Sequence, residues 1–232
     1  MRKISIIALA FLFVACNELQ QVVNQLPQGS IGNAEIASGL KEALQMGIEK
    51  QVGKLALEDG FFKNELVKIL LPEELKKVDN ALRKVGLGKL ADEGLKVMNR
   101  AAEDAVGEAI PIFGNAIRNI SFQDARQILL GGDGAATNYL QQSTETLLYD
   151  KFKPIIDSSF KKVGADKIWA SLISEYNKIP FTKTVDPNLT EYVTLEALDG
   201  VYTMVEIEEN AIRSKVSSRT TTLLQRVFAL QD

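Results

Sequence analysis

The sequence predicts an all-α protein, a multi-helix bundle of amphipathic helices with no significant β-sheet. From Asn33 onwards, apolar residues recur every three or four positions, which is the period of one helical face. Glycines and prolines punctuate these runs, and no segment alternates apolar and polar residues as a half-buried strand does. We therefore expect residues 33–232 to form a single all-helical domain of packed helices.

The first fifteen residues have the features of a secretory signal peptide. Met1-Arg2-Lys3 gives a basic start, Ile4 to Val14 is almost continuously apolar, and the small residue Ala15 ends the run. The apolar run is too short to cross a bilayer as a permanent helix. We expect residues 1–15 to be cleaved.

Cys16 is the single cysteine of the chain and stands at the boundary between the apolar run and polar sequence. Phe13-Val14-Ala15-Cys16 resembles the bacterial lipobox, in which a small residue precedes a cysteine that is acylated and becomes the new N-terminus. Phe13 departs from the usual leucine. The alternative is that Cys16 is an ordinary small apolar residue, but its place at this boundary then has no explanation. We predict lipidation at Cys16, and two or three acyl chains make a stable membrane anchor.

Residues 16–32 are predicted to form the lipidated N-terminus and a flexible tether, because they are rich in Asn and Gln and contain Pro27, Gly29 and Gly32. Asn17 is not the aspartate associated with inner-membrane retention in enteric bacteria. We therefore expect an anchor in the outer membrane with the body facing the periplasm. Surface exposure stays open as an alternative, although Glu18 is the only nearby acid.

Composition excludes some functions. The chain has 27 basic and 30 acidic residues and a formal charge of −3, and loss of Arg2 and Lys3 with the signal peptide makes the mature chain more acidic still. Nucleic-acid binding depends on clustered Lys and Arg, so we expect no nucleic-acid partner. The absence of histidine removes the commonest general base and metal ligand. We predict no metal and no cofactor.

The helices can be placed in order along the body. The first carries the apolar stripe Ile36, Leu40, Leu44, Ile48, Val52 and Leu55. The next begins near Pro72 and stops at Gly86, and a long one over 87–110 is bent or ended by Pro111. Further helices are expected over 122–130, 134–152, 153–163, 166–178, 189–214 and 218–230. In the helix over 134–152, one side is formed by Ala136, Leu140, Thr144 and Leu147. Residues 179–192, with two prolines, are expected to form the longest loop, either a plain connection or a lid.

Two motifs resemble parts of catalytic sites. Gly132, Gly134 and Thr137 imitate part of a phosphate-binding glycine loop, but a helix rather than a strand precedes them. We interpret them as a glycine C-cap followed by an N-cap at Asp133. The Ser-x-x-Lys spacing of serine–lysine enzymes is also present, but without the companion motifs of those enzymes; the three pairs are Ser38–Lys41, Ser158–Lys161 and Ser159–Lys162. We expect no catalytic residue in either motif.

Acidic residues cluster at Glu103-Asp104 and at Glu206, Glu208 and Glu209. We interpret these clusters as solvated helix faces, with one exception. Glu209 shares a stripe with Leu198, Tyr202, Val205 and Ile212, so it needs a partner for its charge. Arg213 and Arg219 are the expected donors, in an ion pair that fixes the two C-terminal helices together; the alternative is an acid that contacts a ligand. Asp124 and Arg126 raise the same question near Gly131.

Four stretches carry a family resemblance: "DARQILLGGDGAATNYL" (124–140), "YNKIP" (176–180), "EYVTLEALDGVYTMVEIEENAIR" (191–213) and "SRTTTLLQRVF" (218–228). Together they resemble a bacterial family of secreted proteins and lipoproteins known as domain of unknown function 4197. The resemblance implies an all-helical extracytoplasmic domain, and it implies no reaction, cofactor or catalytic residue. It gives no role to the matching polar residues Asp124, Thr137, Glu209, Arg213 and Arg219.

We therefore expect a lipid-anchored helical protein of the Gram-negative cell envelope that is not an enzyme and serves in binding or assembly, with a protein or lipid partner. The alternative is a carrier of a small apolar or lipid ligand in a groove between helices, with Tyr139, Trp169, Tyr176 and Phe181 as candidate lining residues. The third hypothesis is a hydrolase that uses a serine–lysine pair or carboxylates.

Overall fold

The computed structural model describes residues 31–84, 86, 88–178, 184 and 188–232. Residues Asn33–Asp232 form one compact unit. The predicted signal peptide, Cys16 and most of the predicted tether lie outside the described residues.

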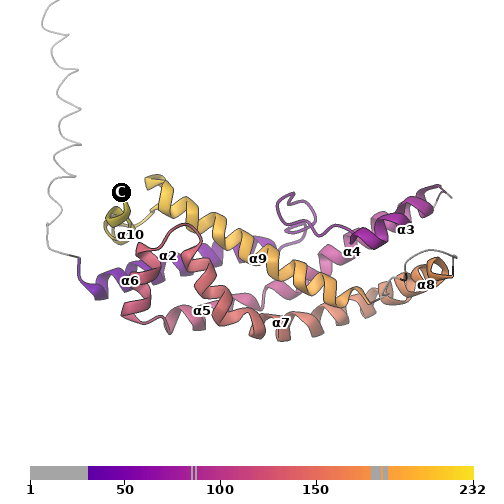
Figure 1. Cartoon of the computed structure of the whole chain (residues 1–232), viewed down its shortest axis with the longest axis horizontal. Coiled ribbons are helices and arrows are strands. Elements are labelled where there is room, and N and C mark those ends of the chain that lie inside the picture. Colours follow the sequence, from indigo (N-terminus) through magenta and orange to yellow (C-terminus); the bar gives the residue numbers. More distant parts are fainter. Residues whose placement is uncertain (1–30, 85, 87, 179–183, 185–187) are drawn as a thin grey trace, which may run out of the picture. The chain divides into compact units, whose positions relative to one another are not determined.

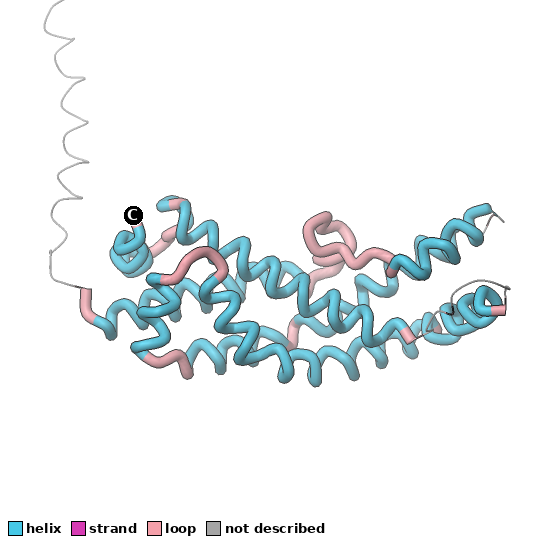
Figure 2. The backbone as a smooth tube through the Cα atoms, in the orientation of Figure 1, coloured by secondary structure: helices cyan, strands magenta, loops and turns pink. Residues whose placement is uncertain are grey.

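Within the described residues the fold is built from helices and contains no strand, so the all-α prediction is confirmed (Figure 2). The helices are α2 (Asn33–Leu55), α3 (Glu73–Lys84), α4 (Gly88–Val106), α5 (Ala109–Arg118), α6 (Phe122–Leu130), α7 (Ala135–Val163), α8 (Ala165–Asn177), α9 (Leu189–Ser214) and α10 (Thr222–Phe228), with short 3-10 turns η2 (Val216–Ser218) and η3 (Ala229–Gln231).

Helix α2 packs against α5, α6, α9 and α10. The predicted apolar stripe of α2 is confirmed, because all six of its residues are buried. These are Ile36, Leu40, Leu44, Ile48, Val52 and Leu55. The same one-sided pattern is present on α9, where Leu198, Tyr202, Val205, Glu209 and Ile212 are all buried. Burial of apolar surface along these stripes supplies the main favourable free energy of folding.

The two longest helices of the described chain, α7 and α9, run side by side and share an interface with α4 (Figure 1). We predicted two helices over 134–163, but α7 continues through Pro154. A proline removes one backbone hydrogen bond, and burial of Phe152, Ile156 and Phe160 on one side of α7 holds the helix together across this position. The expected stripe is confirmed at Ala136, Leu140 and Thr144 but wrong at Leu147, because Leu148 is buried in its place.

The predicted C-terminal end of the long helix over 87–110 is also wrong. It stops at Val106, and Gly107 and Glu108 separate it from α5. Pro111 is the third residue of α5, in the first turn, where a backbone N–H has no partner within the helix and a proline is tolerated.

The longest non-helical segment in the described part of the chain is Ala56–Pro72, between α2 and α3, and not the predicted loop over 179–192. Asn188 caps α9, and Leu189 to Tyr192 belong to its first turn. Residues 179–183 and 185–187 of the predicted loop lie outside the described residues.

Candidate functional site

Glu209 lies on the buried face of α9 and is only 6% exposed. Its Oε1 accepts a hydrogen bond from the N–H of Ala136 at 2.9 Å, and its Oε2 accepts from the N–H and the hydroxyl of Thr137, both at 2.8 Å. These N–H groups belong to the first turn of α7, where they have no partner within their own helix. Glu209 therefore caps α7 from another helix and places negative charge at its positive end.

The local sequence explains why α7 needs this cap. Gly134 precedes α7 with φ of +74°, a left-handed conformation that favours glycine, and it has no side chain that could accept a hydrogen bond. The prediction that Asp133 caps the helix is wrong, because Gly134 occupies that position and Glu209 supplies the acceptor. In a phosphate-binding loop, an external anion would bind at this N-terminal end of the helix. In this protein the Glu209 carboxylate occupies that position.

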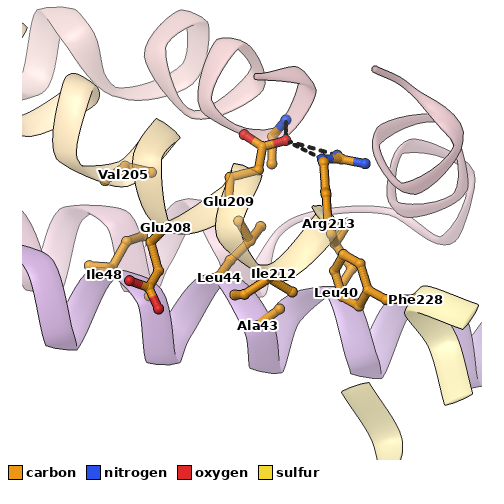
Figure 3. A pocket seen from close by; sticks show the side chains of 12 residues that line it. Leu40, Ala43, Leu44, Ile48, Val205, Glu208, Glu209, Ile212, Arg213 and Phe228 are labelled. Atoms are coloured by element: carbon orange, nitrogen blue, oxygen red, sulfur yellow. Dashed lines mark hydrogen bonds and ion pairs between the residues drawn. The ribbon is translucent and has the colours of Figure 1, made fainter. Parts of the chain in front are cut away.

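Arg213 lies one turn beyond Glu209 and is 8% exposed. Its Nε donates to Glu209 Oε1 at 2.8 Å, which confirms the predicted pair (Figure 3). Its other nitrogens donate to the carbonyl oxygens of Ile128, Leu129 and Gly131 at 2.8–3.2 Å. Those carbonyls stand at the C-terminal end of α6, which is the negative end of a helix.

Thr137, Glu209 and Arg213 thus form one buried cluster, called here the carboxylate–arginine cluster. It joins the end of α6, the start of α7 and the body of α9. We predicted that Glu209 would fix the two C-terminal helices to each other. That prediction is wrong, because the ion pair lies within α9 and its remaining hydrogen bonds reach α6 and α7.

Arg219 is 2% exposed but makes no contact with Glu209 among the described hydrogen bonds. It donates to the carbonyls of Ile212 and Arg213 at 3.0 and 2.8 Å, and to both carboxylate oxygens of Asp232 at 2.7 and 2.8 Å. The hydrogen bonds from Arg219 lower the pKa of the Asp232 carboxyl. Arg219 therefore caps the end of α9 and holds the C-terminal residue.

Asp124 stands apart from this cluster. Its backbone N–H donates to Ser121 Oγ at 3.0 Å, and Ser121 Oγ donates to its carboxylate at 2.7 Å. This is the side-chain cap that starts α6, with Ser121 at the N-cap. Arg126, which raised the same question in the sequence, is exposed. Of the five polar residues singled out in the sequence, the structure brings together Thr137, Glu209 and Arg213.

The chemistry of the carboxylate–arginine cluster follows from its partners. Both oxygens of Glu209 and all three donor nitrogens of Arg213 bind groups of the protein itself. Such an arrangement holds a fixed geometry at the junction of three helices. A general acid or base needs instead a group that can reach a substrate proton.

Apolar side chains of α2, α9 and α10 line a crevice beside this cluster, as Figure 3 shows for Leu40, Leu44, Val205, Ile212 and Phe228. The free space in the crevice is about 20 Å³. That is room for about one water molecule. The crevice is therefore a packed helix junction and has no space for an apolar ligand unless α10 moves away.

An open hollow of about 540 Å³ adjoins the crevice, between α2 and the segment that includes η2 and α10. Glu208 borders both and points towards α2, on the other side of α9 from Glu209 (Figure 3). Its carboxylate accepts from Lys50 Nζ at 2.6 and 2.8 Å and from the Gln51 amide. Glu208 is 8% exposed, so its interpretation as part of a solvated face is wrong, whereas Glu206 is exposed as predicted.

Glu103 is a second buried carboxylate, at 4% exposure, and here too the solvated-face interpretation is wrong. It accepts from the backbone N–H groups of Asp59, Phe61 and Phe62 at 3.0–3.2 Å and pairs with Arg100. The signal that could have revealed it is the run of small residues Ala101, Ala102 and Ala105, which lets another segment approach α4 closely. Its neighbour Asp104 is exposed and accepts a hydrogen bond from the Ser159 hydroxyl at 2.7 Å.

The Ser-x-x-Lys pairs have other partners. Ser38 donates to the Ala34 carbonyl and Lys41 to the Arg118 carbonyl, while Lys161 donates to Asp157. No hydrogen bond joins a serine to the lysine of its pair among the described residues.

Of the four aromatic residues proposed to line a carrier groove, the two whose side chains are described, Tyr139 and Trp169, lie far apart. Trp169 is 3% exposed and packs so closely on Gly94 that a Cβ there would overlap the indole ring. Tyr139 lies near the start of α7, about 30 Å along that helix from the turn that borders Trp169. Phe181 and the Tyr176 side chain lie outside the described residues.

Among the described residues, no group of His, Cys, Asp and Glu side chains is placed to hold a metal ion. None of the described helices combines the length and the apolar character of a membrane span.

Comparisons with known proteins agree with the family resemblance of the sequence. The family model described as "Protein of unknown function (DUF4197)" matches residues 30–229. No curated protein and no solved structure matches the chain.

Proposed function

The chain belongs to the DUF4197 family, and from that premise we propose that it is a lipid-anchored helical protein of the bacterial cell envelope that serves in binding or assembly and is not an enzyme. In this proposal Cys16 carries the anchor, which lies in the outer membrane and leaves the body in the periplasm. Residues 16–32 tether the body to the membrane.

One observation supports a binding role over a catalytic one: the buried charged side chains of the body are engaged with the protein's own groups. Glu209, Arg213 and Glu103 all direct their hydrogen bonds to backbone or side-chain partners in neighbouring segments. Burying charge is costly unless it is paired. These contacts fix the positions of helices and thereby favour a rigid body that presents its surface to a partner.

The anchor is tested by expressing the full chain in a Gram-negative bacterium with an alkyne-tagged fatty acid. We expect the tag on the wild-type protein, recovery in the outer-membrane fraction, and a mature chain that begins at acylated Cys16. Cys16→Ser should lose the tag and either leave the membrane or stay unprocessed. If Cys16→Ser were cut and retained like the wild type, the anchor proposal would be wrong.

The binding role is tested by native mass spectrometry of the acylated protein released from membranes in mild detergent. A stoichiometric protein partner that survives release and dissociates under activation would support assembly. A bound lipid in addition to the acyl chains on Cys16 would support the carrier alternative, which needs α10 to open because the crevice holds only about 20 Å³. Recovery of the chain with neither would count against both roles.

A further inference from the structure

The segment Ala56–Pro72, called here the leucine loop, exposes three large apolar side chains. Leu57, Leu66 and Leu70 are 65%, 67% and 54% exposed. Single exposed apolar residues are common on protein surfaces. Three such leucines on one non-helical segment mark that segment as a candidate contact surface.

The leucine loop is firmly attached to the body. The Glu103 carboxylate accepts from three of its backbone N–H groups. The Asn99 side chain forms two hydrogen bonds with the backbone of Ile69, both 2.9 Å long. Because side chains of α4 hold the loop near both ends, the leucines are exposed by a fixed backbone.

The inward side of the loop already has its own apolar residues. Phe61, Val67 and Ile69 are buried, at 0%, 8% and 1% exposure. Phe61 and Val67 pack on Gly200 of α9 so closely that a Cβ there would lie 2.7 Å from the Phe61 ring. The Tyr192 hydroxyl of α9 donates to the Leu70 carbonyl at 2.9 Å. The inward side of the loop is therefore already filled, and Leu57, Leu66 and Leu70 are free to contact an apolar partner outside the protein.

Most charges on the loop are paired within the protein, and Glu65, beside Leu66, is an exposed carboxylate without an ion pair among the described contacts. Arg100 binds Glu58 and Asp59, and Lys63 also pairs with Asp59. The Lys68 ammonium lies over the Phe62 ring, 4.9 Å from its centre. A partner of strong opposite charge is thus not favoured, and burial of the leucines is the main gain that the loop offers.

We propose that the leucine loop contacts the lipid bilayer and inserts Leu57, Leu66 and Leu70 into its interfacial region. The inference rests on the proposed anchor at Cys16, which would keep the body next to a bilayer. Leucines beside a lysine and an aromatic ring suit the boundary between head groups and acyl chains. The loop would be a second membrane contact that orients the body.

Chain length allows this second contact. Helix α2, which links the tether to the leucine loop, has 23 residues and is roughly 35 Å long. The tether from residue 16 to residue 32 can span up to roughly 60 Å if fully extended. A body anchored at Cys16 can therefore bring the far end of α2 to the membrane.

The first test measures depth in the acylated full chain. Leu66→Cys introduces a unique thiol, because the sulfur of Cys16 is acylated, and it is labelled with the fluorophore NBD. We expect quenching by spin-labelled lipids in vesicles of phosphatidylethanolamine and phosphatidylglycerol. The matched control is Leu147→Cys on α7, where the leucine is 55% exposed; it should show little quenching. Absence of quenching at position 66 on vesicle-bound protein, or equal quenching at both positions, would overturn the proposal.

The second test does not depend on the anchor. In a Cys16→Ser chain expressed without residues 1–15, the triple variant Leu57→Ser/Leu66→Ser/Leu70→Ser should reduce partition into the same vesicles by about tenfold for each leucine that inserts. The control triple Leu130→Ser/Leu147→Ser/Val163→Ser changes residues of 55–57% exposure elsewhere and should partition like its parent. Circular dichroism verifies that both fold. Equal partition of the two triples would overturn the loop proposal, whereas failed acylation of Cys16 would overturn the anchor alone.

Discussion

Glu209 and Glu103 are buried carboxylates that accept hydrogen bonds from the backbone of another segment. Each faces an arginine of its own helix, Arg213 in one case and Arg100 in the other. Each binds N–H groups that the local chain leaves without a partner, at the start of α7 and at the start of the leucine loop. The cost of burying the charge is offset because both the carboxylate and the backbone groups gain partners.

Tyr202 is a buried phenol whose pKa affects stability at alkaline pH. Its hydroxyl lies 2.9 Å from Thr144 Oγ1, and burial raises its pKa to about 12. The fold thus favours the neutral phenol, and this contribution to stability is complete below the unfolded pKa of about 10 and lost as the pH rises through 12.

We predict that Tyr202→Phe lowers the free energy of unfolding by about 1 kcal/mol at neutral pH, since one hydrogen bond is lost. Above pH 10 the difference from the wild type should shrink, because only the wild type must keep a buried phenol neutral. Urea unfolding of both proteins between pH 7 and about 11.5 measures this. A constant difference across that range would contradict the assignment.

At the residue scale, sequence reasoning found Glu209 because a charge on an apolar stripe is conspicuous. It missed Glu103 because the partners of that residue are backbone groups of a loop, and only the small residues Ala101, Ala102 and Ala105 around it indicate that another segment packs there. It also assigned the cap of α7 to Asp133, the nearest suitable residue in sequence. The actual cap, Glu209, comes from a distant part of the chain, and local rules cannot supply it.

At the scale of elements, α10 is held on α2 by close packing. Val227 of α10 lies against Gly39 of α2, where a Cβ would come within 2.6 Å of Val227 Cγ2. Arg226 pairs with Glu35 at 2.9 Å at the same junction. This junction closes one side of the crevice beneath Phe228.

Gly39→Ala should therefore force α10 to shift and cost about 1–3 kcal/mol of stability, as overpacking does. The control is Gly53→Ala in the same helix, where a Cβ would meet nothing within 4 Å. It should gain about 0.5–1 kcal/mol from better helix propensity. Differential scanning calorimetry compares the two, and a Gly39→Ala protein as stable as Gly53→Ala would contradict the described packing.

The periodic pattern predicted the existence of the helices well, and α9 agrees with its predicted range of 189–214. Interruptions were harder to predict. Pro154 does not break α7, because buried residues continue on both sides of it, and Gly107 rather than Pro111 separates α4 from α5. A proline or glycine lowers the stability of a helix only near its own position. Packing against other helices stabilises the helix more strongly and decides where it stops.

At the scale of the whole body, the carboxylate–arginine cluster connects elements that are distant in sequence. Glu209 reaches α7 and Arg213 reaches α6, both from α9. Loss of one group should therefore weaken the body as a unit. A ligand-contacting acid would behave differently, because its replacement would leave stability nearly unchanged and remove binding.

Equilibrium unfolding of Glu209→Gln in urea tests the structural role of the cluster most directly. The variant removes the charge that pairs with Arg213 and caps α7, so we predict a loss of about 3 kcal/mol in the free energy of unfolding. Glu206→Gln changes an exposed acid of the same helix and should stay within about 0.5 kcal/mol of the wild type. A Glu209→Gln protein as stable as Glu206→Gln would contradict the structural role and favour a ligand-contacting acid.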